Sequence, residues 1–468
     1  MLNNLSLQQA KQLLRQKKAT SLELTRFYLE RIKKLEPKIS AFITVCEKEA
    51  QDQAKKADEL LSQGDKKPLL GIPISVKDNF NTIGIQTTAS SKVLESYIPP
   101  YDATVVASLK RAGAVIVGKT NMDAWAHGSS TETSDFGPTK NPWNIKTLPG
   151  GSSGGSAASV AADEVVASIG SETAGSIRQP AAWCGVVGLK PTYGRVSRYG
   201  VVAMGSSLDS PGPITKTVED SAMILNILAG KDKFDATTSP NIVEDYSKNL
   251  NKNISGLKIG ISSKYFKKCE SEVEKKVEQA LKVFEELGAK IQEIKLFDPQ
   301  YAIAVYTIIQ RAEVSSNLAR YDGIRYGNGR SKFGEEAKRR IMLGTYALSA
   351  GYYDQYYNKA QKVRTLIIED FKKAFKQVDV IVGPTSPSTA LPLGASKGHP
   401  MFGEMADILV EPSSIAGLPG INVPCGFSRE DLPVGMQIIG PQFSESIILN
   451  VANQFEKNTD FHKVKPKL

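Results

Sequence analysis

Histidine is scarce in this sequence of 468 residues, where it occurs only three times. His399 lies in a segment rich in proline and glycine, and His462 lies in the basic C-terminal tail. A Ser-His-Asp triad would therefore have His127 as its one plausible base. If a serine is the nucleophile of this protein, we expect its base to be another kind of side chain.

Cysteine is almost as rare, and the four cysteines include no Cys-x-x-Cys pair. Their scatter argues against a disulfide framework and against a zinc site, so we expect them to be reduced and structural. The four residues are Cys46, Cys184, Cys269 and Cys425.

Long apolar runs are missing as well. No segment approaches the roughly 18 uninterrupted apolar residues that a membrane-spanning helix needs. Residues 1–18 have neither the apolar core nor the small-residue cleavage site of a secretory signal. We therefore expect a cytoplasmic protein that does not associate with membranes. The net charge of +10 is mild for this length, and a solvated basic surface explains it most simply, but charge alone leaves an RNA partner open.

Helical and strand patterns alternate along the chain, which indicates an α/β protein. Thr20 and Glu23 form a capping box before a helix that Pro37 is expected to end. Residues 68–78 are predicted to form a strand that delivers Lys77 near its C-terminal end.

Later parts of the chain show the same alternation. Residues 257–375 begin with a strand and an amphipathic helix and are predicted to form a peripheral helical lobe. Two further strands are predicted near residues 380 and 420. The basic tail after Glu456 is expected to be frayed. Length alone allows two or three domains, or one large domain.

One motif suggests nucleotide binding but lies in the wrong context. Residues 113–120, GAVIVGKT, match the phosphate-loop pattern. A phosphate loop presents free backbone N–H groups in a turn between a strand and a helix. Here a predicted helix comes first, Gly113 marks the turn, and residues 114–117 are themselves the predicted strand. We therefore do not expect a phosphate site at this motif.

The stretch over residues 141–194 is rich in Gly, Ser, Ala and Pro and poor in large apolar residues. We expect it to form a long structured loop around one small-residue helix. Its glycine turns can aim consecutive N–H groups at one point and so build an oxyanion hole. Ser152 also satisfies a GxSxG pattern, but the strand that a nucleophile elbow requires does not precede it.

Three motifs in the first half of the chain resemble the amidase signature family. They are PISVKDNF around Lys77, PGGSSGGSAA around Ser152, and GSETAGSIRQPAAWCGVVGLKPTYG around Ser176. The resemblance implies a single amidase domain over residues 1–468, with residues 141–194 as its catalytic segment. It also implies an α/β/α sandwich in which helices flank a large mixed central β-sheet.

By this resemblance Ser176 is the nucleophile, Ser152 is a bridging serine that follows a cis peptide bond, and Lys77 is the base. An ammonium ion has no acceptor, so Lys77 can take a proton only when it is neutral, which requires burial that lowers its pKa. Ser152 would then relay the proton between Lys77 and Ser176. The oxyanion would be held by backbone N–H groups, each contributing roughly 3 kcal/mol. These belong to Thr173, Ala174, Gly175 and Ser176.

Longer segments, at residues 200–222, 315–327, 339–357 and 415–426, resemble the glutamine-hydrolysing subunits of tRNA-dependent amidotransferases. Glutamine needs a carboxylate for its α-ammonium and a cation for its α-carboxylate. The resemblance assigns these roles to Asp407 and Arg340, with Arg339 left open as the alternative cation. Tyr306 is expected as a weaker contact.

One departure from that pattern concerns residues 124–127. They are Ala-Trp-Ala-His, where related subunits are expected to have Glu-Phe-Ala-Met. The rim of the substrate pocket is therefore expected to differ, and His127 is expected to be structural.

The function that this resemblance implies is that of a glutaminase subunit, which releases ammonia through a glutamyl-enzyme on Ser176. Its partners would be amidotransferase subunits B and C, which would bind mischarged tRNA and use ATP and Mg²⁺. No cofactor or metal is expected in this chain. The acceptor, glutamyl-tRNA(Gln) or aspartyl-tRNA(Asn), is a choice that lies in the partner. The alternatives are a stand-alone amidase acting on another amide, and a scaffold subunit with a decayed site.

Overall fold

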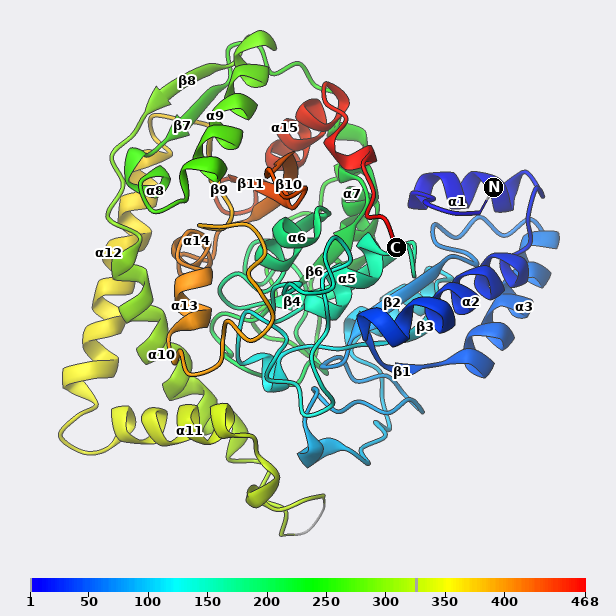
Figure 1. Ribbon diagram of the computed structural model, residues 1–468, viewed down its shortest axis with the longest axis horizontal. Helices are drawn as coiled ribbons and strands as arrows, with labels where there is room; N and C mark the ends of the chain where they lie inside the picture. Colours follow the sequence, from blue (N-terminus) through cyan, green and yellow to red (C-terminus); the bar gives the residue numbers. More distant parts are fainter. Residues whose placement is uncertain (1, 325–326) are drawn as a thin grey trace.

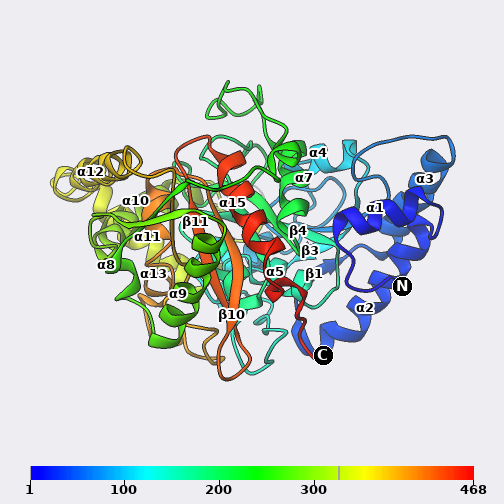
Figure 2. The ribbon, with the colours of Figure 1, turned by 90° about the horizontal axis from the view of Figure 1, so that it is seen from above.

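One mixed β-sheet runs through the molecule, and helices flank it (Figure 1, Figure 2). The computed structural model describes residues 2–324 and 327–468, and within them the sheet has 11 strands in the order β1-β3-β2-β4-β6-β5-β10-β11-β9-β7-β8. The predicted single-domain α/β architecture with a large mixed sheet is confirmed. The strands are β1 (Phe42–Val45), β2 (Pro73–Lys77), β3 (Val115–Thr120), β4 (Ala167–Glu172), β5 (Val187–Lys190), β6 (Ser210–Thr215), β7 (Lys258–Ile261), β8 (Lys290–Glu293), β9 (Val380–Pro384), β10 (Gly420–Phe427) and β11 (Pro433–Ile439).

The α-helices connect these strands, mostly over the faces of the sheet. The largest apolar cluster joins β2, β3 and β4 to helices α4, α7, α9 and α15. The helices are α1 (Leu7–Arg15), α2 (Ser21–Ile39), α3 (Glu47–Ser62), α4 (Thr104–Arg111), α5 (Gly154–Ala161), α6 (Arg178–Cys184), α7 (Val218–Leu228), α8 (Ser263–Phe266), α9 (Ser271–Glu286), α10 (Gln300–Leu318), α11 (Glu335–Leu348), α12 (Lys359–Ala374), α13 (Phe402–Ala406), α14 (Glu411–Ile415) and α15 (Glu445–Lys457).

Strand β2 is parallel to both of its neighbours, β3 and β4, and every residue of these three strands is buried. Burial of both faces is typical of parallel strands that helices cover on two sides. The strand predicted over residues 68–78 forms in its C-terminal half and ends at Lys77.

Helix α2 begins with the predicted capping box. The Thr20 hydroxyl accepts a hydrogen bond from the Glu23 N–H, and the Glu23 carboxylate accepts one from the Thr20 N–H. The expected end at Pro37 is wrong, because the helix continues to Ile39 and is capped by Ser40 at φ 55°. Pro37 lies in the last turn, where its missing N–H removes only one helical hydrogen bond.

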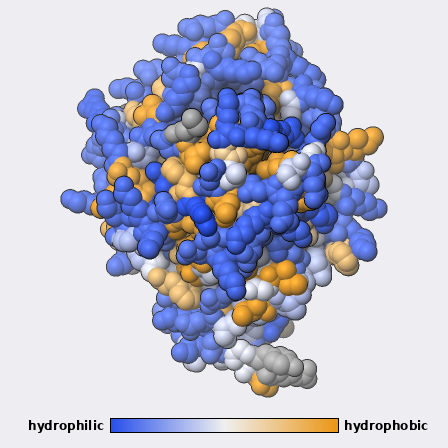
Figure 3. All heavy atoms as spheres, turned by 90° about the vertical axis from the view of Figure 1, so that its right-hand side faces the viewer, coloured by the Kyte–Doolittle hydropathy of each residue, from blue (hydrophilic) through white to orange (hydrophobic). Residues whose placement is uncertain are grey.

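Helices α1 to α3 form one side of the molecule, at the right of Figure 1. Figure 3 shows this side, and hydrophilic residues cover most of it. The helices turn their apolar faces inward, as their periodicity predicts. Buried residues of α1 and α2 include Leu7, Ala10, Leu14, Leu24, Tyr28 and Ile32.

The Gly/Ser-rich segment over residues 141–194 contains more regular structure than expected. Helix α5 is the predicted small-residue helix, but β4, α6 and β5 also lie in this segment, so the expected long loop is wrong. Helix α5 packs closely on β4: a Cβ atom added to Gly170 would lie 2.9 Å from the Ser153 hydroxyl oxygen. Small residues are needed here for close packing, not for a flexible loop.

Residues 257–375 extend one end of the sheet. Strand β7 pairs with β9 and β8 pairs with β7, and helices α9, α10 and α12 lie around that end (Figure 1). The strand predicted at the start of this segment is β7, and β8 is a second strand that was not predicted.

The C-terminal tail has more structure than predicted. Helix α15 continues to Lys457, and Phe461–Lys463 form a further 3₁₀ turn, so fraying does not begin at Glu456. Among the helices within residues 2–324 and 327–468, none combines the length and apolar character that crossing a bilayer takes.

Candidate active site

Strand β2 delivers Lys77 into a fully buried position. Its Nζ atom lies 2.8 Å from the Ser152 hydroxyl oxygen and 3.1 Å from the carbonyl oxygen of Ser171. Burial lowers the pKa of Lys77 to about 7, although nearby carboxylates, chiefly that of Asp123, act in the opposite direction. Near neutral pH a large share of this amine is therefore uncharged and able to accept a proton.

Ser152 lies in a tight turn just before α5. Its peptide bond with Gly151 is cis, and its carbonyl accepts a hydrogen bond from the Asp123 N–H. A Cβ atom on Gly151 would lie 2.2 Å from the Asp123 carboxylate, so only glycine fits there. The N–H of the next residue, Ser153, donates to the carbonyl of Ser176 at 3.1 Å. This hydrogen bond joins the turn that carries Ser152 to the turn that carries Ser176.

Ser176 lies in a loop between β4 and α6 and is 4% exposed. The Glu172 carboxylate accepts hydrogen bonds from the N–H groups of Ile177 and Arg178 and so shapes this loop. Within the described parts of the chain, the N–H groups of residues 173–176 donate to no other protein group. A loop of free N–H groups around a serine is the arrangement that holds an oxyanion.

The Glu172 carboxylate also forms a fully buried ion pair with Arg178, at 2.7 Å. The same guanidinium donates to the hydroxyls of Ser413 and Ser414 and to the side chain of Gln437. Sequence reasoning missed this pair, although a charged residue so soon after the serine in GSIRQP was a visible signal. The pair fixes the start of α6 and the shape of the loop over residues 173–177 that carries Ser176, which we call the serine loop.

We expect Arg178→Met to lower the free energy of unfolding by about 3–5 kcal/mol, because it leaves the Glu172 carboxylate buried without its cation. Urea unfolding followed by circular dichroism measures this change. Lys372→Met, which removes a surface pair with Glu369, is the matched control and should change stability little. A loss below about 1 kcal/mol in Arg178→Met would contradict the assigned role.

Two of the residues expected to contact the substrate, Asp407 and Tyr306, reach the loop that carries Ser176. Asp407, just after α13, accepts a hydrogen bond from Ser129 on Oδ2 at 2.7 Å, whereas its Oδ1 is buried and has no partner among the described residues. A Cβ atom on Gly175 would lie 2.4 Å from that Oδ1. The Tyr306 hydroxyl lies 2.9 Å from the hydroxyl of Thr173.

The two candidate arginines differ in burial. The Arg340 side chain is 4% exposed and lies 3.8 Å from Glu404, while the Arg339 side chain is 31% exposed. Both arginines pair with Glu336, and Arg339 also donates to the carbonyl of Pro400. The geometry favours Arg340 as the cation that faces the interior.

A family model described as Amidase matches residues 23–449 of this chain. The chain belongs to the amidase family. The A subunit of glutamyl-tRNA(Gln) amidotransferase from Caldanaerobacter subterraneus subsp. tengcongensis is 54% identical over 476 aligned residues, which cover 98% of this chain and 97% of that protein. The family that the three motifs predicted is confirmed.

Solved structures of amidase-family proteins are similar over the whole chain. The crystal structure of the A subunit of glutamyl-tRNA(Gln) amidotransferase from Thermotoga maritima matches with a TM-score of 0.84 and 44% identity, covering 98% of this chain and 96% of that one. A peptide amidase from Stenotrophomonas maltophilia matches with a TM-score of 0.85 and 29% identity, covering 97% of each chain.

The phosphate-loop pattern of this amidase-family chain has no phosphate-loop structure. The strand predicted over residues 114–117 is β3, which begins at Val115 and continues beyond the predicted end through Gly118, Lys119 and Thr120. The Lys119 amine is buried and donates to the carbonyl of Phe80 and the hydroxyl of Thr87. In the described part of the chain, no group of three or more His, Cys, Asp or Glu side chains is placed to hold a metal ion.

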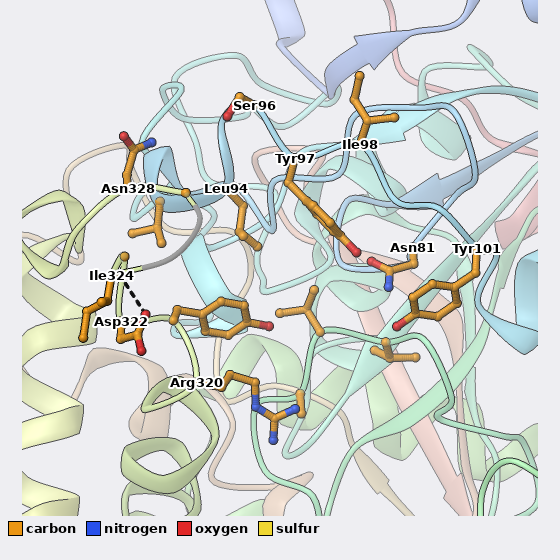
Figure 4. Close-up of a pocket in the computed structure, with 17 residues that line it drawn as sticks. Asn81, Leu94, Ser96, Tyr97, Ile98, Tyr101, Arg320, Asp322, Ile324 and Asn328 are labelled. Carbon is orange, nitrogen blue, oxygen red and sulfur yellow. Dashed lines mark hydrogen bonds between the residues drawn. The ribbon is translucent and has the colours of Figure 1, made fainter.

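The structure also contains a surface pocket of about 1060 Å³ (Figure 4). Tyr97, Tyr101 and Arg320 are among the residues that line it, and none of Lys77, Ser152 and Ser176 does. Its wall connects to the site indirectly: Val202 donates to the carbonyl of Asn79, whose side chain in turn donates to Ser171. The pocket and the candidate active site are therefore separate features.

Proposed function

We propose that this amidase-family protein is the glutaminase subunit of a tRNA-dependent amidotransferase. The observation that carries the proposal is the buried Lys77 amine in contact with the Ser152 hydroxyl, beside the loop that holds Ser176. High identity to the A subunit of a glutamyl-tRNA(Gln) amidotransferase along nearly the whole chain supports the same function.

In the proposed reaction, the Ser176 oxygen attacks the side-chain amide carbon of glutamine. The Ser176 proton passes through the Ser152 hydroxyl to the neutral Lys77 amine. The N–H groups of residues 173–176 stabilise the oxyanion, and the proton then returns to the leaving nitrogen, so ammonia departs. Water attacks the glutamyl ester by the same route, which releases glutamate and restores Ser176.

The substrate's two charged ends have matching groups at this site. Asp407 offers an unpaired carboxylate oxygen to the α-ammonium, and Arg340 with Tyr306 meets the α-carboxylate. Burial raises the pKa of Asp407 well above its usual range, and an arriving ammonium would lower it again. Binding of a cationic group therefore stabilises the ionised form of this carboxylate.

The released ammonia would pass to partner subunits B and C in the cytoplasm. Those partners would bind the mischarged tRNA, glutamyl-tRNA(Gln) or aspartyl-tRNA(Asn), and activate it with ATP and Mg²⁺. In this proposal the present chain carries out amide hydrolysis alone, and Lys77, Ser152 and Ser176 are its catalytic residues.

Affinity purification through a tag on this chain tests the proposal. We expect two further proteins to copurify, and we expect the complex to amidate mischarged tRNA with glutamine as the nitrogen source. Glutamine hydrolysis, followed as glutamate release, should be faster in the complex than in the isolated chain. A chain that purifies alone and hydrolyses other amides faster than glutamine would instead identify a stand-alone amidase.

A further inference from the structure

A group of buried polar atoms next to the candidate active site has no partner within the described residues. Eight such atoms lie on side chains from α10, from α13 and the residue that follows it, from α14, and from the loop that precedes Ser129. An unpaired buried donor or acceptor costs about 1–3 kcal/mol, so their concentration in one region indicates that a polar ligand pairs with them. The atoms belong to His127 (Nδ1, Nε2), Arg311 (Nε, Nη1), Glu404 (Oε2), Asp407 (Oδ1) and Glu411 (Oε1, Oε2).

Helix α13 connects the members of this group. Glu404 accepts a hydrogen bond from Arg311 Nη2 at 2.9 Å, and Arg340 Nη2 lies 3.8 Å from the same oxygen. Next to Glu404, Gly403 packs on the loop of His127: a Cβ atom there would lie 3.4 Å from the Ser129 hydroxyl. That hydroxyl donates to Asp407 after the same helix. The two arginines and the His127 loop therefore all pack against the segment over residues 403–407.

Helices α10 and α11 cross very closely, which brings Arg311 and Arg340 together. The crossing point is Gly344, where a Cβ atom would lie 1.9 Å from the carbonyl oxygen of Arg311. Gly344 comes one turn after Arg340 on α11, so the close crossing holds both guanidinium groups against the single carboxylate of Glu404.

Positive charge is in excess around the carboxylates of Glu336 and Glu404. Glu336 pairs with Arg339 and Arg340, and Glu404 pairs with Arg311 and Arg340, so three cations share two carboxylates. Burial raises the pKa of Asp407 and Glu411 well above the usual range, which favours their neutral forms. One positive charge is left for a ligand anion, and the Nε and Nη1 nitrogens of Arg311, which have no partner among the described residues, can donate to it.

His127 is a neutral neighbour of these arginines. Burial lowers its pKa well below the usual range, and the charges of Arg340, Arg311 and Arg339 lower it further. A neutral imidazole keeps one N–H donor and adds no further positive charge to the region. It can therefore share an anion with Arg311 without repelling it.

We propose that Arg311 and His127 form, together with Arg340, the binding site for the α-carboxylate of the substrate, and so select amino-acid amides over amides that lack a carboxylate. This inference rests on the proposed glutaminase function and adds two specificity-determining residues to it. It also gives a role to His127, one of the residues in the segment 124–127 that depart from the pattern expected of related subunits.

Three small amides test the inference on the purified complex, with ammonia release as the readout. L-Glutamine has both charged ends, glutaramate lacks the ammonium, and 4-aminobutanamide lacks the carboxylate. Arg311→Gln should lower kcat/KM for glutamine and for glutaramate roughly 10- to 100-fold, mainly through KM. Its effect on 4-aminobutanamide should be at least about 10 times smaller, since no carboxylate is there to lose.

His127→Met, which fills the space without a donor, should raise KM for the two carboxylate substrates. His127→Gln, which keeps a neutral donor, should restore part of the loss. Lys338→Gln removes an exposed cation from the same helix, α11, and is the matched control, with unchanged KM for all three amides. The rate at which a small fluorophosphonate labels Ser176 checks in each variant that the nucleophile is intact.

Equal losses on all three amides, accompanied by slower labelling, would show that Arg311 and His127 act only on the structure and would overturn the inference. Unchanged KM values for glutamine would overturn it too. A different result would contradict the proposed function itself. In that case the fluorophosphonate would label Ser176 in the wild-type complex, but the complex would hydrolyse 4-aminobutanamide at least as well as glutamine.

Discussion

Ser176→Ala should reduce glutamine hydrolysis by the assembled complex by about 10⁴- to 10⁶-fold, which is the effect of removing the nucleophile from a serine hydrolase. Alanine has no oxygen to attack the amide, and the free N–H groups of residues 173–176 can stabilise only the slow attack of water. Amidation of mischarged tRNA with added ammonium salt should continue at the wild-type rate, because it needs no ammonia from this site. Glutamate release and amidated-tRNA formation are measured side by side.

Ser156→Ala is the matched control for this substitution. Ser156 lies in the same Gly/Ser-rich segment and is likewise buried, but its hydroxyl contacts Thr120 and has no contact with Lys77. It should retain most of the glutamine hydrolysis. If Ser176→Ala kept glutamine-dependent amidation as fast as ammonia-dependent amidation, Ser176 would not be the nucleophile.

The parts of the fold that could be predicted are those where a local pattern agrees with the tertiary environment. The apolar pattern before Lys77 predicts β2, which forms in the C-terminal half of the predicted range, and the helical spacing of the buried face of α9 predicts that helix, which forms. Strand β4 could not be predicted in this way, because α5 packs so closely on it that residues such as Gly170 must be small. Its sequence therefore shows no alternation of large apolar residues, and the sequence favoured a loop.

The candidate site was predictable only as far as its motifs extend. Lys77, Ser152 and Ser176 each lie in a distinctive glycine-rich or strand-end context, and the structure brings their segments together. Arg178 and Arg311 are single arginines in helices, and nothing in a linear pattern separates a buried arginine from an exposed one. Their burial depends on helix packing between distant segments, such as the crossing of α10 and α11 at Gly344.

Lys77→Arg should lower kcat/KM for glutamine by about 10²- to 10⁴-fold, the usual contribution of a general base. A guanidinium group stays charged at every accessible pH and has no acceptor, so it cannot take the proton that Ser152 relays. The wild-type kcat/KM for glutamine should rise with pH through about 7 and then level off. The base must lose its own proton before it can accept one, and burial lowers the pKa of Lys77 to about 7. The residual rate of Lys77→Arg should show no inflection there.

A second buried lysine makes this assignment testable. Burial also lowers the pKa of Lys190 to about 7, but its amine donates to the carbonyl of Pro191 and has no contact with Ser152. Lys190→Met, which is similar in volume and uncharged, should therefore keep the inflection near pH 7 even if the protein is less stable. If the inflection disappeared in Lys190→Met and persisted in Lys77→Arg, the proton acceptor of this site would have to be sought away from strand β2.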